Sequence, residues 1–158
     1  MKLSIKDLSL NALVGALYFV LVYVFQFMSF TEIQFRIAEA LLVLLLFNPK
    51  LAPGLVLGNF LVGLFSPYGI IDALVGTIAS IVAIVLMIIF KKRIYATLLF
   101  PAISNGLIVG IMISITSKTP YIYNIGTVFI GEFVVMYLVG LPLYYYIKNN
   151  DYIKELIS

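Results

Sequence analysis

Charged side chains occur inside long apolar stretches of this sequence, where each of them needs a chemical reason. They are Arg36, Glu39, Asp72 and Glu132. A charged residue within a membrane span costs about 2.5–3.5 kcal/mol on insertion scales, and such residues commonly mark ligand, ion or proton sites. Carboxylates and a guanidinium form strong, charge-assisted hydrogen bonds to polar solutes. The sequence therefore predicts a polar binding site within an apolar protein.

Amide side chains accompany these charges. Gln26, Gln34, Asn59, Asn105 and Asn124 all lie in or beside apolar stretches. An amide can donate and accept hydrogen bonds at once, which suits either a ligand or a neighbouring helix. For Asn59 and Asn105 these two interpretations are equally favoured. The charged and amide residues together fall in the outer half or the middle of the expected helices, as expected for a site that opens outwards.

The charged residues also have structural explanations. Arg36 and Glu39 are three residues apart, so they share a helix face and could form an ion pair with each other. Asp72 stands near the start of an expected helix, where a carboxylate stabilises the helix N-terminus. Glu132 lies deep in its stretch with no basic residue nearby in the same helix. For Glu132 the binding interpretation is therefore favoured.

The elements that must position these side chains are membrane-spanning helices. Of 158 residues, 63% are hydrophobic and 11% are charged, whereas soluble domains carry about 25% charged residues. The mean hydropathy is +1.15. We therefore expect one all-α membrane domain over residues 1–158. The apolar stretches predict six transmembrane helices, the second of them short for a hydrocarbon layer about 30 Å thick. They cover residues 8–28, 37–47, 51–65, 70–90, 94–117 and 121–147.

Basic residues predict the orientation of this bundle. With six spans both termini lie on one side, and that side carries 8 of the 10 Lys and Arg residues. Arg36 and Lys118 fall on the other side. The positive-inside rule then places both termini in the cytoplasm. Basic loops beside the spans account for the net charge of +3, so we expect no nucleic-acid partner.

The residue types that are missing exclude several classes of function. The sequence has no Cys and no His, which removes thiol and histidine catalysis and the ordinary zinc sites. Aspartyl chemistry needs two facing Asp side chains, and only Asp72 lies near the membrane. We expect no catalytic residue, cofactor or metal. The predicted spans leave no room for a nucleotide-binding domain, so a partner must hydrolyse any ATP that is used.

Small residues mark one face of the first helix near its cytoplasmic end. Ala12 and Ala16 are four residues apart, with Gly15 beside Ala16. Such spacing lets a second helix approach closely. Packing within the bundle explains the pattern equally well.

Three runs of the sequence are more specific than these patterns: IQFRIAEAL at 33–41, GNFLVGLFSP at 58–67 and GIIDALVGT at 69–77. Together with SNGLIVG at 104–110 and Gly131-Glu132, they resemble the substrate-binding (S) components of energy-coupling factor (ECF) transporters, of the queuosine-precursor type called QueT. The resemblance implies a six-helix bundle in the bacterial cytoplasmic membrane. Such a bundle binds substrate from outside and associates with a transmembrane coupling subunit and two ATPase subunits. Ala12 and Ala16 match the motif with which such components dock on the coupling subunit.

The substrate implied by this resemblance is a 7-deazaguanine precursor of queuosine. Its guanine-like edge offers adjacent N–H donors that a carboxylate accepts in a bidentate manner. We expect Glu39 and Glu132 to supply the carboxylates, with Arg36 orienting Glu39. The full set of expected substrate-binding residues is Gln34, Arg36, Glu39, Asn59, Asp72, Asn105 and Glu132.

Two alternatives stay open. One is a stand-alone secondary transporter of a small polar metabolite, in which Glu39, Asp72 or Glu132 relays protons or ions. A chain of this length would then have to dimerise to give the usual repeat architecture. The other is an S component for a different vitamin.

Overall fold

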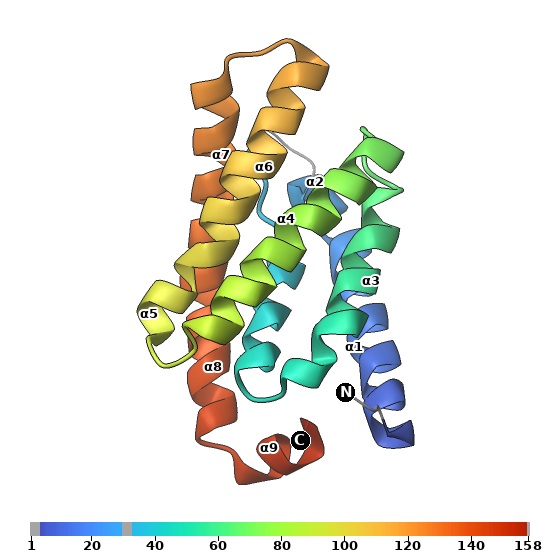
Figure 1. Ribbon diagram of the computed structural model, residues 1–158, viewed down its shortest axis with the longest axis vertical. Coiled ribbons are helices and arrows are strands. Elements are labelled where there is room, and N and C mark those ends of the chain that lie inside the picture. Colours follow the sequence, from blue (N-terminus) through green and yellow to red (C-terminus); the bar gives the residue numbers. More distant parts are fainter. Residues whose placement is uncertain (1–3, 30–32, 158) are drawn as a thin grey trace.

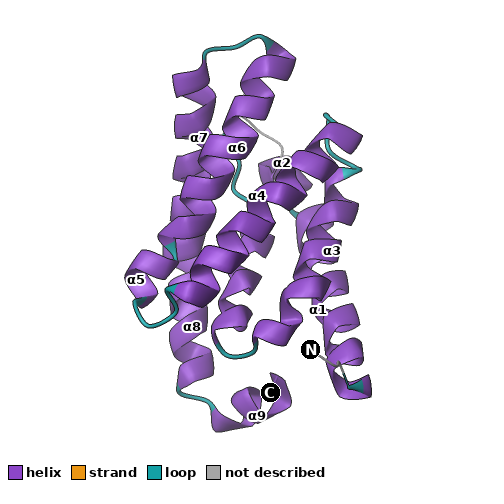
Figure 2. Cartoon of the chain, viewed as in Figure 1, coloured by secondary structure: helices purple, strands orange, loops and turns teal. Residues whose placement is uncertain are grey.

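The computed structural model describes residues 4–29 and 33–157, and over these ranges the chain is helical without any strand (Figures 1 and 2). In chain order the helices are α1 (Ile5–Val24), α2 (Gln26–Ser29), η1 (Ile37–Leu46), η2 (Pro49–Leu51), α3 (Ala52–Gly63), α4 (Ile70–Ile89), α5 (Ile94–Thr97), α6 (Leu99–Ser117), α7 (Tyr121–Val135), η3 (Met136–Gly140), α8 (Leu141–Lys148) and α9 (Asp151–Ile157).

Within the described parts of the chain, four helical segments are long and apolar enough to cross a membrane. They are Ile5–Val24, Ile70–Ile89, Ile94–Ser117 and Tyr121–Lys148. The second and third predicted spans form shorter helices, because η1 has 10 residues and α3 has 12. Neither reaches the roughly 30 Å of a hydrocarbon core. The all-helical membrane bundle is confirmed, whereas the count of six crossings remains a prediction.

Helix η1 occupies the interior of the bundle. It is a 3₁₀-helix in which the residues from Ala38 to Leu45 are all buried. It contacts α1, α3, α4, α7 and η3, and Figure 1 shows it in cyan behind α4. A helix that is apolar on every side belongs in such an interior. Since protein surrounds most of it, its length need not match the thickness of a bilayer.

Helices α1 and α3 pack closely through glycines. A Cβ atom on Gly58 would lie 2.8 Å from the carbonyl oxygen of Gly15, so only glycine fits this contact. Asn11 reinforces it, because its Oδ1 accepts the backbone N–H of Gly54 at 2.7 Å. Its Nδ2 donates to the carbonyl oxygen of Lys50 at 2.9 Å. Asn11 thereby satisfies one of the free amides at the start of α3.

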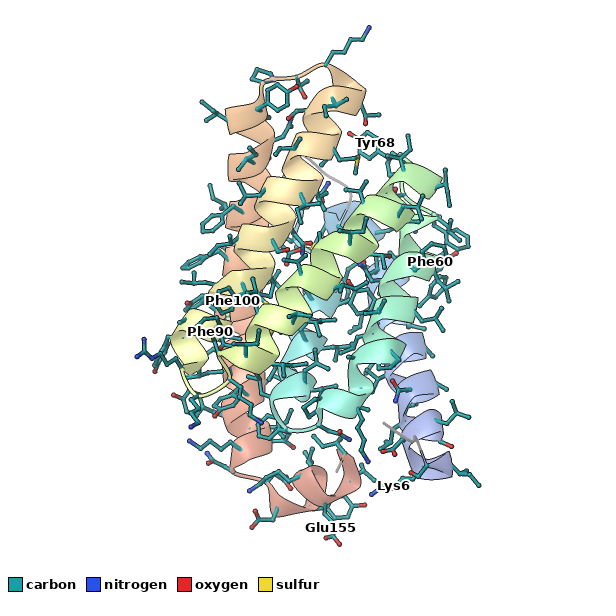
Figure 3. The ribbon with its side chains drawn as sticks, viewed as in Figure 1. Lys6, Phe60, Tyr68, Phe90, Phe100 and Glu155 are labelled. Carbon is teal, nitrogen blue, oxygen red and sulfur yellow. The ribbon has the colours of Figure 1, made fainter. Side chains whose placement is uncertain are left out.

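Both ends of the described chain lie at the same end of the bundle. Lys6 Nζ donates to the backbone oxygen of Glu155 at 3.3 Å, and Figure 3 labels both residues at its lower end. Asn48 Nδ2 donates to the backbone oxygen of Ile157 at 2.6 Å. An even number of chain crossings explains this arrangement.

The opposite end is held by hydroxyl and amide groups. The hydroxyls of Tyr68 and Ser117 lie 2.9 Å apart and join the loop after α3 to the end of α6, with Tyr68 labelled in the upper part of Figure 3. Asn124 Nδ2 lies 2.9 Å from Ser114 Oγ and 2.6 Å from Thr119 Oγ1. Asn124 therefore fixes the turn between α6 and α7.

Candidate functional site

A group of polar side chains lies buried at the centre of the bundle. We call it the polar cluster, and each member is at most 2% exposed. Burying a charge costs several kcal/mol unless it is paired, so a cluster with three charged members is a strong indication of function. Its members are Tyr18, Arg36, Glu39, Asn59, Asn105 and Glu132.

Tyr18 and Glu39 form the first part of this cluster. The hydroxyl of Tyr18, on α1, lies 2.7 Å from Glu39 Oε1, on η1. It also lies 3.2 Å from Oδ1 of Asn59, on α3. A hydroxyl has one proton to donate, and the shorter distance and the charge of the carboxylate favour Glu39. Tyr18 thus fixes one oxygen of Glu39 and leaves the other free.

The side chain of Asn59 makes most of the hydrogen bonds in this part of the cluster. Its Oδ1 accepts Nη2 of Arg36 at 2.9 Å. Its Nδ2 donates to Ser80 Oγ at 2.7 Å and to the backbone oxygen of Gly76 at 3.1 Å. Both amide hydrogens are therefore used within the protein. Asn59 joins α3 to α4 and holds the guanidinium of Arg36 in place.

Glu132 and Asn105 form the second part of the cluster. Asn105 Nδ2, on α6, donates to Glu132 Oε1, on α7, at 2.8 Å. The charges of Glu39 and Arg36 both act on Glu132, so the two parts face a common region. A π-helical turn, η3, begins four residues after Glu132. Such turns are frequent at functional sites because they reorient the side chains around them.

Several buried polar atoms of this cluster have no hydrogen-bond partner among the described residues. They are Arg36 Nη1, Glu39 Oε2, Asn105 Oδ1 and Glu132 Oε2. Folded proteins pair nearly all of their buried polar atoms, so each exception needs an explanation. These atoms belong to one cluster and come from three segments, namely η1 with its N-cap Arg36, α6 and α7. A polar ligand that reaches all four would satisfy them together.

The predicted pair of Arg36 and Glu39 has a different geometry from the one expected. No ion pair within 4 Å joins them; in the parts of the chain that the structure describes, such pairs join Asp7 to Lys50 and Asp151 to Lys154. Arg36 donates to Asn59, and Tyr18 rather than Arg36 holds Glu39. The two charges still attract each other at longer range.

The remaining predicted site residues lie at the edge of the cluster. Asp72 is 7% exposed, in the first turn of α4, and its charge acts on Arg36. Its side chain makes no hydrogen bond to any described residue, and α4 is capped by Gly69 without a side-chain contact. Gln34 is 9% exposed, and its backbone packs directly against Gly131. Both residues border the cluster without joining its hydrogen bonds.

Two residues of the site were missed by sequence reasoning. Tyr18 follows Asn11 by seven residues, which puts both polar groups on one face of α1. A buried Tyr hydroxyl usually has a hydrogen-bond partner, so this spacing could have predicted that Tyr18 joins a polar group inside the bundle. Ser80 similarly shares a face of α4 with Asp72 and Gly76, at intervals of four residues.

A groove lies on the outer side of α1 and α3. It has a volume of about 460 Å³, and its lining includes Ala12, Gly15, Ala16, Leu57 and Leu61. Both alanines are exposed. Gly15 instead faces Gly54 of α3, where a Cβ atom would come within 2.7 Å of the carbonyl oxygen. The glycine therefore serves packing within the bundle, and the alanines leave an open surface.

Comparison with known proteins gives one match. The family model described as QueT transporter matches residues 8–149. This range contains every member of the polar cluster and both alanines of the groove. No curated protein and no solved structure matches the chain.

Proposed function

The chain belongs to the QueT transporter family, and we propose that it is the substrate-binding component of an ECF-type importer in the bacterial cytoplasmic membrane. Membership makes it a membrane transporter of a small substrate. The proposal adds that the chain binds its substrate from outside with both termini in the cytoplasm. A transmembrane coupling subunit and two ATPase subunits then complete the import.

The polar cluster is the observation that carries this proposal. Its four unpaired atoms supply three acceptors and one donor in a buried position. Ligand sites commonly fix a small solute with a few well-placed polar groups, and these buried atoms can serve that purpose. Tight binding by the chain alone is what an importer with a separate binding component requires.

A 7-deazaguanine fits the donors and acceptors of this cluster. The ring offers N–H donors on its amide and amino groups, which Glu39 Oε2 can accept, and a carbonyl oxygen, which can accept Arg36 Nη1. The unpaired oxygens of Glu132 and Asn105 then accept hydrogen bonds from the substituent or from the far side of the ring. We therefore propose a queuosine precursor of this type as the substrate.

The groove between α1 and α3 supports a partner in the membrane. Ala12 and Ala16 present a surface of small side chains beside an open volume of about 460 Å³. Small residues allow a helix of another protein to approach closely, as transmembrane helix pairs do. We propose that the coupling subunit docks there.

Uptake of labelled 7-aminomethyl-7-deazaguanine by cells that express the chain tests this function. We expect uptake with the coupling subunit and ATPases present and none when the coupling subunit is deleted, although the purified chain still binds. Undiminished uptake after the deletion would instead identify a stand-alone secondary transporter.

A further inference from the structure

Four exposed basic side chains lie in the turn between α4 and α5 and at the end of α8, in the lower part of Figure 1. They are Lys91, Lys92, Arg93 and Lys148. Among the described residues, ion pairs within 4 Å join Lys50 to Asp7 and Lys154 to Asp151 instead. The four positive charges therefore have no carboxylate partner in the part of the chain that the structure describes.

The turn between α4 and α5 is held by groups other than these basic side chains. The backbone oxygen of Phe90, labelled in Figure 3, accepts the backbone N–H of Arg93 at 3.0 Å and the hydroxyl of Thr97 at 2.7 Å. Basic side chains can bind the last carbonyl groups of a helix, but this carbonyl already has two donors. The side chains of residues 91–93 can therefore bind a partner outside the chain.

Two tyrosines connect this turn to Lys148. The hydroxyls of Tyr95, on α5, and Tyr145, on α8, lie 3.3 Å apart. Lys148 Nζ lies 6.0 Å from the ring centre of Tyr145, within the range of a cation–π contact. The contact between the two hydroxyls uses one of their two protons, so one hydroxyl can still donate to an anion. Phosphate oxygens accept such donors together with those of Lys and Arg.

An aromatic stripe on α7 and η3 leads to the same place. The rings of Phe129, Phe133 and Tyr137 stack in succession, with centroids 6.1 and 4.4 Å apart. The hydroxyl of Tyr137 donates to the backbone oxygen of Tyr95 at 2.6 Å. Phe133 is 38% exposed, and Leu138, next to Tyr137, is 71% exposed. An open apolar surface that ends at a group of cations matches the two parts of an anionic phospholipid, its acyl chains and its phosphate.

We propose that this corner of the bundle binds an anionic phospholipid. The four basic side chains and the Tyr95–Tyr145 pair bind the phosphate of the headgroup, and the acyl chains lie along the aromatic stripe. Basic pockets between transmembrane helices bind anionic headgroups in this way. A soluble acidic protein would use the charges but not the stripe, so the stripe favours a lipid. The inference is independent of the substrate and of the proposed function.

Competition between two lipids tests the inference with the unaltered protein. Purified chain in detergent is mixed with equal amounts of phosphatidylglycerol and phosphatidylcholine that carry the same acyl chains. Native mass spectrometry then counts the lipid that the chain retains. We expect the form bound to phosphatidylglycerol to be at least about 10-fold more abundant. Equal retention of the two lipids would overturn the inference.

A double variant tests the place of binding. Arg93→Gln combined with Lys148→Gln removes one positive charge from each side of the tyrosine pair, so the preference for phosphatidylglycerol should fall to within about 3-fold. Lys118→Gln combined with Lys154→Gln is the control, because it removes the same charge from the turn after α6 and from α9. The control should keep the full preference. An equal preference in the two folded variants would overturn the assignment to this corner.

Inorganic phosphate separates a lipid site from a site for the free anion. It has no acyl chains to lie along the aromatic stripe, so it should displace no more phosphatidylglycerol than sodium chloride does at the same ionic strength. Displacement by phosphate beyond that of the chloride reference would assign the corner to a free anion and overturn the lipid.

Discussion

The hydroxyl of Tyr18 fixes the orientation of Glu39 from a different helix. It lies 2.7 Å from Glu39 Oε1 in a buried position, while Glu39 Oε2 has no partner. We therefore propose that Tyr18 is a positioning residue that presents the free oxygen to a ligand. Asn59 likewise holds Arg36, because its Oδ1 accepts Nη2 of the guanidinium. The Nη1 atom of Arg36 is also unpaired.

Tyr18→Phe should weaken ligand binding without unfolding the protein. The change removes the hydrogen bond that holds Glu39 in its binding orientation, so affinity should fall by roughly 5-fold or more, or at least about 1 kcal/mol. The measurement is calorimetric titration with 7-aminomethyl-7-deazaguanine. Tyr146→Phe is the control, because Tyr146 is 61% exposed on α8. Equal affinity in wild type and Tyr18→Phe would contradict the positioning role.

At the scale of elements, the site depends on how closely α1 and α3 approach each other. Gly58 precedes Asn59, and a Cβ atom at Gly58 would lie 3.0 Å from Tyr18 Cβ. The same glycine lines the groove that contains Ala12 and Ala16. The outer surface of this helix pair and the polar cluster are therefore separated by a single layer of residues.

Gly58→Ala should destabilise the fold although alanine is the better helix former. Its Cβ atom would lie 2.8 Å from the carbonyl oxygen of Gly15, and forced overpacking costs about 1–3 kcal/mol. Gly126→Ala is the matched control, because nothing lies within 4 Å of its Cβ position. In thermal unfolding in detergent, Gly58→Ala should lower the Tm and Gly126→Ala should raise it or leave it unchanged. A Tm for Gly58→Ala at or above that of wild type would contradict this packing.

Filling the groove should separate transport from binding. Ala12→Leu combined with Ala16→Leu adds bulk on the exposed face of α1, so we expect uptake to be abolished and substrate affinity to stay within about 2-fold. Leu13→Phe combined with Leu17→Phe is the control, since both leucines are exposed on α1 but do not line the groove. Normal uptake by the alanine variant would rule out docking at this surface.

The sequence predicted the helices better than their internal geometry. The turn at 48–50 and the start of α4 at Ile70 were both predicted, since proline and glycine mark them. The 3₁₀ form of η1 and the π-turn η3 were not, because they follow from packing against each other rather than from local preference. The charged members of the site stood out in apolar stretches. Tyr18 did not, because tyrosine is also common at membrane surfaces.

At the scale of the whole molecule, basic residues gather toward the end that holds both termini. The turns before α3 and between α4 and α5, and the segment around α9, lie in the lower part of Figure 1, and the turn between α6 and α7 lies at the top. The lower turns include Lys50 and residues 91–93, whereas the upper turn carries Lys118. By the positive-inside rule, we propose that the lower end faces the cytoplasm.

Single cysteines test this orientation cleanly because the chain has no Cys. Tyr121→Cys, at the start of α7, should react in intact cells with a maleimide that cannot cross membranes. Glu155→Cys, on α9, should react only after the cells are permeabilised. Both native side chains are exposed, so access depends on the side of the membrane. The reverse pattern would contradict the orientation, and labelling of both in intact cells would contradict a cytoplasmic C-terminus.

Calorimetric titration of the purified chain alone with 7-aminomethyl-7-deazaguanine tests the central claim most directly. The buried, unpaired atoms of the polar cluster predict binding with a Kd of about 1 µM or lower, and Glu39→Gln should weaken it at least about tenfold. No detectable binding by a folded, monodisperse sample, or full affinity in Glu39→Gln, would contradict the polar cluster as the substrate site.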